Sequence, residues 1–382
     1  MLSGSLSGIR VVDLSRLYPG PLCTLMLADL GADVVKIESP DGELARYFPP
    51  YQFGSGATFL QLNRGKRSLT LDLKKNGGAA VLHRLLEKAD VLVESFRPGV
   101  MKRLGLDAVS LQDQYNSLIY CSITGYGQEG PDSRRPGHDI NYISLAGVLG
   151  LEGDPRHGLL IPPVQIADTL GAFQASTAIC AALVQRARTG RGQHLDISLL
   201  DGAFFTLIHL ASLHFADVPL RRGELPLSGR LAGYNVYRTR DGRYLALGFL
   251  EPKFWEQFCL KMNLDQFANT QVQEDQQELI GELGRRFAAR TLKEWMDFFR
   301  EEDLCVSPVR EIPEAIAEAH HRGLLVNVEY PSGSLKQLKT PFVKDGAAAT
   351  RAPLLGEHNL EILKEYGYSA AEIDALREDG VL

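Results

Sequence analysis

Residues 9–38 read IRVVDLSRLYPGPLCTLMLADLGADVVKIE, and this stretch decides the fold of the chain. Residues 9–14 form a short apolar run typical of a buried strand, and residues 32–38 form a second one. The segment 21–31 between them is predicted to be a helix, with Pro21 suited to its first turn and Gly31 to its end. A strand, a crossover helix and a second strand predict a parallel pair with a right-handed connection.

The same alternation continues along the first half of the chain. A helix is expected over 76–89, and further strands are expected over 89–96 and 117–125. Continuously apolar strands fit a sheet that is covered on both faces. We therefore predict an α/β fold in which residues 1–200 form a large domain with an open parallel sheet.

The pattern of predicted secondary structure changes from Leu225 onward. The runs YNVYRT and RYLALGFL flank Asp241-Gly242, and an Asp-Gly step between two such runs indicates a hairpin. Three helical stretches follow the second run. We expect a smaller α+β domain over 225–305.

Composition excludes several classes of protein. The 382 residues are 45% hydrophobic, and 41 Lys and Arg face 47 Asp and Glu, which gives a net charge of −6. A mildly acidic chain does not favour nucleic-acid binding, for which a basic face is required. No apolar run approaches the ~20 residues of a membrane span, the best candidate being 203–216, and the N-terminus lacks the pattern of a secretory signal. Five Cys without a CxxC pair predict reduced thiols in a cytoplasmic protein.

One glycine motif deserves comparison with the dinucleotide-binding fingerprint. Gly125, Gly127 and Gly130 spell GxGxxG directly after a predicted strand. The residues after Gly130 contain two prolines and no apolar helical period, so no helix N-terminus is expected there to hold a pyrophosphate. We interpret the segment as a glycine loop, and an NAD-binding oxidoreductase is kept only as a rival hypothesis.

Three other positions could carry chemistry. His138 and Asp139 are adjacent on a loop beside glycine and proline, where a His bonded to backbone is the simpler interpretation. Asp168 lies at the expected start of a helix, so it is either an ordinary N-cap or a partly desolvated acid, base or nucleophile. Glu251 follows a strand and precedes Pro252, as a surface Glu at a helix start would. No metal-binding motif such as HExxH is present, and no metal is expected.

Several ordered motifs together resemble the class III (CaiB/BaiF) CoA-transferase family over nearly the whole chain. The chain looks most similar to the α-methylacyl-CoA racemase branch, through GHDINY and the strand followed by Glu-Pro. The motifs are GIRVVDLSRLYPGP, LADLGADVVKIE, LNRGKRSLTLDLK, VLVESFRPGVMKRLGL, ITGYGQEGP, ADTLGAFQA, GRGQHLDISLLDG and SPVREIPEA.

The resemblance implies a role for each matched position. Asp168 is the family's catalytic aspartate, a covalent nucleophile in the transferases and an acid/base in the racemases. His138 matches the racemase histidine, and Glu251 a glutamate that pairs with it from the partner subunit. Asp139 is expected to help position the reacting groups or the thioester oxygen. Segments that hold CoA contribute Lys66, Arg67, Lys74 and Arg97, whereas Ser39 replaces an arginine that covers the adenine in many relatives.

The resemblance also implies an architecture. The large domain is completed by residues 330–382, segments 201–224 and 306–329 are linkers, and two chains interlock as a homodimer. The implied substrate is an acyl-CoA thioester, with no tightly bound cofactor. Racemisation of 2-methylacyl-CoA is the favoured activity. CoA transfer is the first alternative, and a non-catalytic CoA-binding protein is a further one.

Overall fold

The computed structural model describes residues 4–153, 158–273, 275–342 and 350–382. These residues fold as two compact units. Unit 1 takes Met1–Val148, Pro162–Thr206 and Ala319–Leu382, and unit 2 takes Leu149–Ile161 and Leu207–Glu318. The segment 149–161, expected within the large domain, therefore groups with unit 2, as do most of the two expected linkers.

A six-stranded parallel sheet forms the centre of unit 1. Its order is β5-β2-β1-β6-β7-β8, and every neighbouring pair runs parallel. The predicted α/β class with a parallel sheet is confirmed, although β8 was not expected. The strands are β1 (Arg10–Asp13), β2 (Asp33–Glu38), β5 (Arg67–Thr70), β6 (Val91–Glu94), β7 (Ile119–Thr124) and β8 (His194–Ser198).

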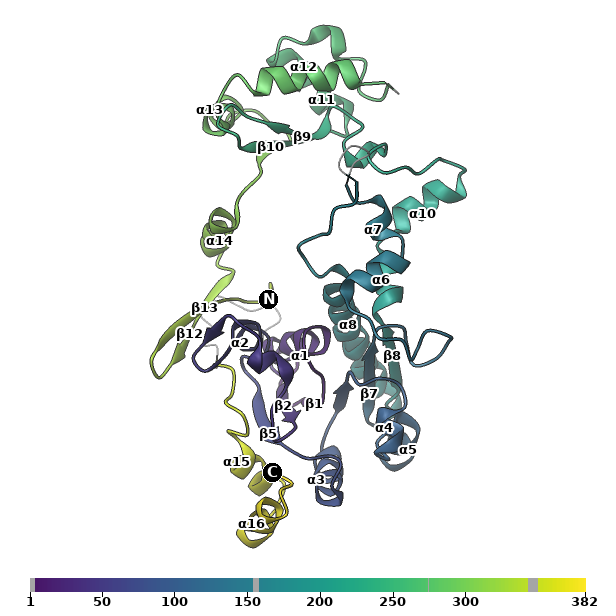
Figure 1. Ribbon diagram of the computed structural model, residues 1–382, viewed down its shortest axis with the longest axis vertical. Helices are drawn as coiled ribbons and strands as arrows, with labels where there is room; N and C mark the ends of the chain where they lie inside the picture. The colour runs from purple at the N-terminus through teal and green to yellow at the C-terminus, as the bar shows by residue number, and fades with distance from the viewer. Residues whose placement is uncertain (1–3, 154–157, 274, 343–349) are drawn as a thin grey trace. The chain divides into compact units, whose positions relative to one another are not determined.

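Helices cover both faces of this sheet, as its apolar strands require. One face is covered by α1 (Pro19–Asp29) and α8 (Ile166–Thr189), which contact each other and lie side by side in Figure 1. The other face packs into one apolar core with α3 (Asn76–Leu86), α4 (Val100–Arg103), α5 (Ala108–Gln114), α15 (Asn359–Glu365) and α16 (Ala370–Glu378).

Shorter elements complete unit 1. Helix α6 (Asp139–Leu145) contacts α8 and α9 (Leu199–Phe205). The others are α2 (Ala57–Leu62), α7 (Val148–Leu151) at the boundary with unit 2, and the hairpins β3–β4 (Tyr51–Gln52, Ser55–Gly56) and β12–β13 (Leu325–Tyr330, Gly333–Leu338).

Among the described helices, α8 alone is long and apolar enough, by length and composition, to cross a membrane. It replaces 203–216 as the best candidate for such a span. Its Ala172, Ala175 and Ile179 are fully buried inside unit 1. Core helices of globular domains pass the same test. In α8, 39% of the apolar window is buried, and Phe173 and Val184 are exposed.

Unit 2 contains a three-stranded antiparallel sheet and a helical layer. The turn expected at Asp241-Gly242 joins β9 to β10, and Gly242 has the positive φ of +77° that such a turn requires. Trp255, Phe258 and Phe287 are fully buried in its core. The elements are α10 (Ile208–Phe215), β9 (Tyr234–Arg238), β10 (Tyr244–Gly248), α11 (Pro252–Lys261), α12 (Gln277–Phe287), α13 (Leu292–Phe298), β11 (Val306–Pro308) and α14 (Ile312–His321), whose end lies in unit 1.

A buried charge network lies at the carboxyl ends of β1 and β2 and includes Lys66, which immediately precedes β5. Lys66 Nζ is 3.1 Å from the Asp13 carboxylate, and Lys36 Nζ is 3.1 Å from the Glu43 carboxylate. Arg46 is paired with Glu38 at 2.7 Å. All six side chains are buried, and opposite charges in such a place must be paired because each alone would have a large desolvation cost.

This network predicts that Lys66→Met destabilises unit 1 strongly. Removing one partner of a buried pair costs about 3–5 kcal/mol, because Asp13 would be left charged and unpaired. Urea unfolding followed by circular dichroism measures the change, and Lys74→Met, at an exposed lysine, is the control that should leave the midpoint unchanged. Equal midpoints for Lys66→Met and the wild type would contradict this assignment.

Candidate active site

Two helix starts meet in unit 1 and bring together the segments that carry His138 and Asp168. The Asp139 carboxylate, in the first residue of α6, accepts a hydrogen bond of 3.0 Å from the backbone N–H of Asp168. His138 immediately precedes α6, and its own N–H donates to the Asn141 side chain at 3.0 Å. The two predicted catalytic residues therefore lie on adjoining helix starts.

The observed start of α8 differs from the one expected from the sequence. The helix begins at Ile166 after Gln165, so Asp168 is its third residue and not its N-cap, which corrects the sequence interpretation. Gln165 makes no side-chain cap, although the first amides of a helix have no acceptor within the helix. Asp139 supplies the missing acceptor from another helix. The Asp139 carboxylate thus holds the backbone at Asp168.

The surroundings of Asp168 make its carboxyl group an acid of intermediate strength. Burial, together with the negative charge of Asp139, raises the pKa of Asp168 from 3.8 to about 7. Protonated and ionised forms are then both populated near neutral pH. A group poised in this way can donate or accept a proton, which suits general acid–base catalysis.

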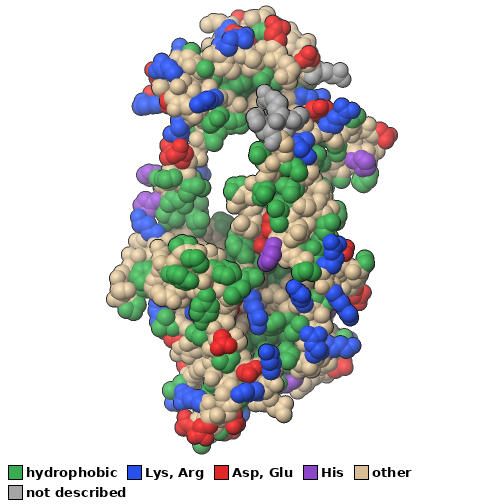
Figure 2. Space-filling model, viewed as in Figure 1, with side chains coloured by type: hydrophobic (Ala, Val, Ile, Leu, Met, Phe, Trp, Pro, Cys, Tyr) green, Lys and Arg blue, Asp and Glu red, His purple; other side chains and the backbone are tan. Residues whose placement is uncertain are grey.

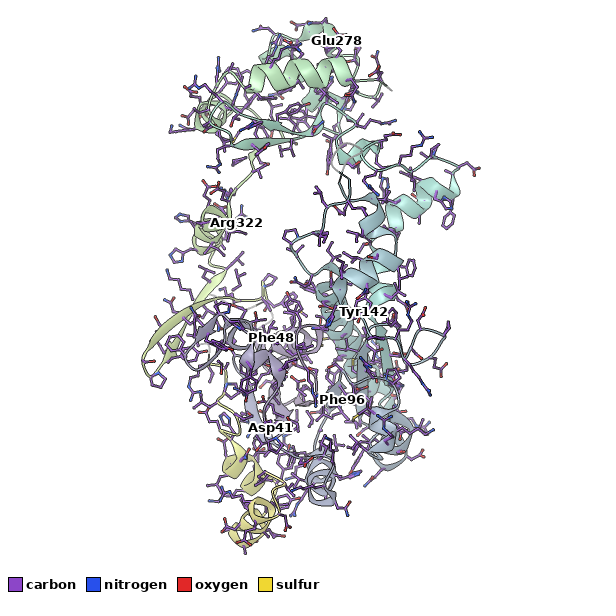
Figure 3. The ribbon with its side chains drawn as sticks, in the orientation of Figure 1. Asp41, Phe48, Phe96, Tyr142, Glu278 and Arg322 are labelled. Carbon is purple, nitrogen blue, oxygen red and sulfur yellow. The ribbon has the colours of Figure 1, made fainter. Side chains whose placement is uncertain are left out.

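Tyr142 is a site residue that the sequence interpretation missed. It lies one helical turn after His138 in α6, is buried, and packs edge-on against Tyr126 with 5.2 Å between ring centroids. Figure 3 labels it on α6. Burial and the nearby Asp168 carboxylate raise the pKa of Tyr142 well above its usual range, and the Arg97 guanidinium opposes that rise. The i, i+4 spacing from His138 was the available signal.

Gly125 of the glycine motif, together with Gly137, leaves room for the packing of the two tyrosine rings. A Cβ at Gly125 would lie 2.4 Å from the Tyr142 hydroxyl oxygen, and a Cβ at Gly137 would lie 2.7 Å from that of Tyr126. The residues after Gly130 form turns, and the next helix is α6. The context required for a dinucleotide-binding fingerprint is absent from this described segment, in agreement with the sequence interpretation.

The four cationic residues expected to bind CoA have different surroundings. Lys66 is buried, and its Nζ donates to the side chains of Asp13, Thr24 and Asn63 and to a backbone carbonyl. Lys66 is therefore not expected to contact CoA, because the N–H donors of its ammonium group are hydrogen-bonded within the protein. Arg67 pairs with Asp33, Glu361 and Glu365, which ties α15 to the sheet.

Lys74 and Arg97 are exposed, as a ligand contact requires. Figure 2 shows Lys and Arg side chains gathered on one face of unit 1. Ser39 follows β2 and donates a hydrogen bond to the Gly42 carbonyl at 3.1 Å. Of the four predicted cations, Arg97 is the one whose charge acts on the pKa of Tyr142. The charge of Asp168 acts on the same hydroxyl group.

Glu251 belongs to unit 2, where it is exposed and precedes α11. Its pairing with His138 stays a prediction. Within the described residues, no group of three or more His, Cys, Asp or Glu could hold a metal ion.

Comparisons with known proteins identify the family of the chain. A family profile described as CoA-transferase family III matches residues 6–359. The chain belongs to this family of enzymes.

Its relatives include both isomerases and transferases. The chain is 37% identical to human alpha-methylacyl-CoA racemase, over 99% of this chain and 97% of the relative. It is 30% identical to human succinyl-CoA:glutarate CoA-transferase, over 99% and 90%. A crystal structure of a CAIB/BAIF family protein from Brucella suis matches with a TM-score of 0.81 at 30% identity, over 94% and 99%.

The contact between Asp139 and Asp168 gives a prediction for Asp139→Asn. An asparagine oxygen can still accept the Asp168 N–H, but the negative charge is gone, so the pKa of Asp168 should fall from about 7 while burial keeps it above 3.8. NMR titration of 13C-labelled aspartate measures this, with Asp41→Asn, at an exposed position, as the control. An Asp168 pKa that stays the same or rises would contradict the assigned role of Asp139.

Proposed function

We propose that this protein interconverts the two C2 epimers of 2-methylacyl-CoA thioesters. The observation that carries the proposal is a carboxyl group with a pKa near 7, held at the start of α8 beside the helix start that bears His138. The 37% identity to a racemase over nearly the full length of both chains supports it. The substrate is the CoA thioester, and no tightly bound cofactor is invoked.

Epimerisation needs an acid and a base on opposite faces of C2. In one direction, neutral His138 removes the C2 proton, and the C–H electron pair moves into the enolate of the thioester. Protonated Asp168 then donates its proton to the opposite face of C2. The reverse direction begins with ionised Asp168 and protonated His138, so the protons balance over each turnover.

The pKa of Asp168 sets the pH at which the rate falls on the alkaline side. The enzyme forms that react in the two directions carry the same single proton, held by Asp168 in one and by His138 in the other. Because the equilibrium between the epimers does not depend on pH, epimerisation in both directions should fall together as pH rises above about 7 and Asp168 loses that proton.

The thioester oxygen gains negative charge in the enolate and needs donors. The Asp168 N–H is taken by Asp139, but helix geometry leaves the amides of Ile166 and Ala167 without intrahelical acceptors. We assign them to the oxyanion. Glu251 of a second chain is proposed to orient His138 in an interlocked homodimer.

CoA transfer is the second candidate function, favoured by the family and by relatives such as the succinyl-CoA:glutarate CoA-transferase. There the Asp168 carboxylate would attack the thioester, release CoA as thiolate and form a mixed anhydride. A nucleophile must be ionised, and a raised pKa reduces the ionised fraction at neutral pH. The Asp168 environment therefore suits proton transfer better.

Deuterium exchange tests the proposal. Incubation of (2R)- or (2S)-2-methylacyl-CoA in heavy water should place deuterium at C2 as the epimers interconvert. Asp168→Asn and His138→Asn should each lower epimerisation by roughly 100- to 10,000-fold, the usual contribution of one acid or base. Lys364→Met, at an exposed lysine of α15 with no assigned role in binding or catalysis, should retain the wild-type turnover.

Three results would overturn the assignment. Absence of deuterium at C2 with every branched acyl-CoA tried would contradict proton transfer. Hydroxylamine trapping of an acylated Asp168, with CoA exchange into an added carboxylic acid, would favour the transferase. Full epimerisation by Asp168→Asn would show that Asp168 is not an acid or base of the reaction, whereas a wild-type protein that binds CoA without either activity would be a protein that only binds CoA.

A further inference from the structure

One buried carboxyl group of unit 1 differs from the others in its surroundings. Among the described residues, Glu94 at the end of β6 is only 2% exposed and forms no ion pair. The other fully buried carboxylates described in the structure each have a cationic partner: Asp13 with Lys66, Glu38 with Arg46, and Glu43 with Lys36. A buried charge without a counter-ion has a large desolvation cost, so the setting of Glu94 favours its neutral, protonated form.

A row of polar side chains leads from Glu94 to the protein surface. In the register of the parallel sheet, Glu94 of β6 is paired with Ser122 of β7, and Ser122 with Asp196 of β8. The buried Ser122 hydroxyl is hydrogen-bonded to the Glu94 side chain, and its oxygen lies 3.0 Å from Nε2 of His194. His194 is exposed, and its ring packs edge-on against Tyr120 with 5.4 Å between centroids. The row therefore connects a buried acid with solvent through one hydroxyl group.

This row can carry a proton without the loss of a hydrogen bond. When Glu94 is ionised, the Nε2–H of His194 donates to Ser122, and the Ser122 O–H donates to the carboxylate. A proton from water that binds Nδ1 lets the Nε2 proton pass to Ser122 and the Ser122 proton pass to Glu94. His194 is then neutral again with its proton on Nδ1, and the direction of both hydrogen bonds is reversed. One proton has moved from water to Glu94, and only N–H and O–H bonds have changed.

Glu94 also holds the loop that follows β6, residues 95–99. Its side chain accepts the Phe96 N–H at 2.8 Å, and Figure 3 labels Phe96 on this loop. The loop carries Arg97, whose charge acts on the pKa of Tyr142 in the candidate active site. Opening of the loop would break the Phe96 bond and let water reach the Glu94 carboxyl group. The protonation of Glu94 is therefore linked to the equilibrium between the closed and the open loop.

We propose that Glu94, Ser122 and His194 form a proton-operated latch that sets how often the loop 95–99 opens. With Glu94 protonated, the buried side chain is neutral and the closed loop is favoured. Loss of the proton leaves an uncompensated buried charge, which favours the open loop because water then surrounds the carboxylate. The latch does not depend on which reaction the enzyme catalyses.

The charged and titratable groups around Glu94 agree with this direction. On β8, the Asp196 carboxylate disfavours a second negative charge at Glu94. On β7, burial raises the pKa of Tyr120 and of Cys121 well above their usual ranges, so both side chains stay neutral. On β1, Asp13 is neutralised by Lys66. Among the described residues of the bordering loops and of α4, the following cations form no ion pair with Glu94: Arg16, Arg97, Lys102 and Arg103.

The pKa of Glu94 gives the direction and the range of the pH dependence. Burial, together with the Asp196 charge, raises the pKa of Glu94 from 4.5 to about 7 in the closed form, and the bonds from Ser122 and Phe96 offset only part of this rise. A hydrated carboxyl group in the open form has the ordinary value, so the closed form binds more protons between the two values. Opening should therefore become easier as pH rises from 4.5 to about 7, and it should change no further above about 7 because both forms are then ionised.

Amide hydrogen exchange of the full chain tests the latch. Protection of the Phe96 amide, taken relative to the intrinsic exchange rate at each pH, should fall by up to roughly tenfold per pH unit between about pH 5 and pH 7 and then level off. The Ser15 amide is the control within the same molecule, because it donates to Asp13 at 2.9 Å with the same two-residue spacing. Asp13 is also buried, but Lys66 and Lys36 outweigh the burial and hold its pKa well below the usual range. Protection of Ser15 should therefore be constant over this interval.

Three variants identify the groups of the latch. Glu94→Gln keeps an oxygen that accepts the Phe96 N–H but cannot ionise, so the protection of Phe96 should become constant. Ser122→Ala removes a donor that stabilises ionised Glu94, so the levelling-off should move to higher pH. Asp196→Asn removes the opposing charge, so the levelling-off should move to lower pH. The matched control is Asp113→Asn, at an exposed carboxylate of α5, which should leave the curve unchanged.

The part of His194 has a readout of its own. The 15N chemical shifts of the imidazole distinguish a proton on Nε2 from one on Nδ1. The ring should change from the Nε2–H to the Nδ1–H form as Glu94 takes up its proton, that is, as pH falls through about 7. Burial lowers the pKa of His194 itself, so the ring gains its second proton only at lower pH. Glu94→Gln should abolish the change near neutral pH.

Each contrary result overturns the latch in a recognisable manner. Protection of Phe96 that stays constant from about pH 5 to pH 7, or that rises, would show that ionisation of Glu94 does not loosen the loop. The same fall in Glu94→Gln would place the titrating group elsewhere. A His194 tautomer that does not change while Glu94 titrates would exclude His194 from the latch.

Discussion

The hydrogen bond from the Asp168 amide to the Asp139 carboxylate is the contact on which the site depends. It joins two helices whose starts are far apart in sequence, and it places two carboxyl groups close together in a partly buried setting. The position of the Asp168 backbone and the raised pKa of its carboxyl group therefore both depend on Asp139. Asp139 fixes the start of α8, and its charge adds to burial in raising the pKa of Asp168 to about 7. An acid of this kind is uncommon on a protein surface and is typical of catalytic sites.

A second constraint acts at the carboxyl ends of β1 and β6. Asp13 and Glu94 end these two strands and Lys36 lies in β2, and each of the three buried side chains bonds to the backbone of the loop that follows β1 or β6. Burial of charged groups costs desolvation energy, which the pairing of Asp13 with Lys66 and of Lys36 with Glu43 offsets. The two loops are therefore held in fixed conformations.

Local sequence pattern predicted the sheet well, because buried parallel strands are short apolar runs that need no distant information. The predicted segments 9–14 and 32–38 contain β1 and β2. Strand β8 was missed because its sequence, HLDIS, lacks a continuous apolar run, as an edge strand can. The start of α8 was misplaced because its cap comes from Asp139, a residue of another helix that no local pattern reveals.

The candidate site was predictable only in part for the same reason. Lys66 and Arg67 are neighbours in a basic segment, and sequence cannot distinguish a cation that binds a ligand from one that pairs inside the fold. The structure separates them from Arg97, because Asp13 and Asp33 neutralise the first two. Tyr142 was overlooked because its significance lies in a tertiary neighbour, namely Asp168.

The most direct measurement of the central claim is C2 proton exchange from each pure epimer in heavy water, with the His138→Asn and Asp168→Asn variants compared. If the two residues serve opposite faces, each variant keeps one base and should exchange the proton of one epimer only, with the preferred epimer reversed between the two variants. Exchange of both epimers by either variant, or the same preferred epimer for both, would contradict a site in which His138 and Asp168 act on opposite faces of C2.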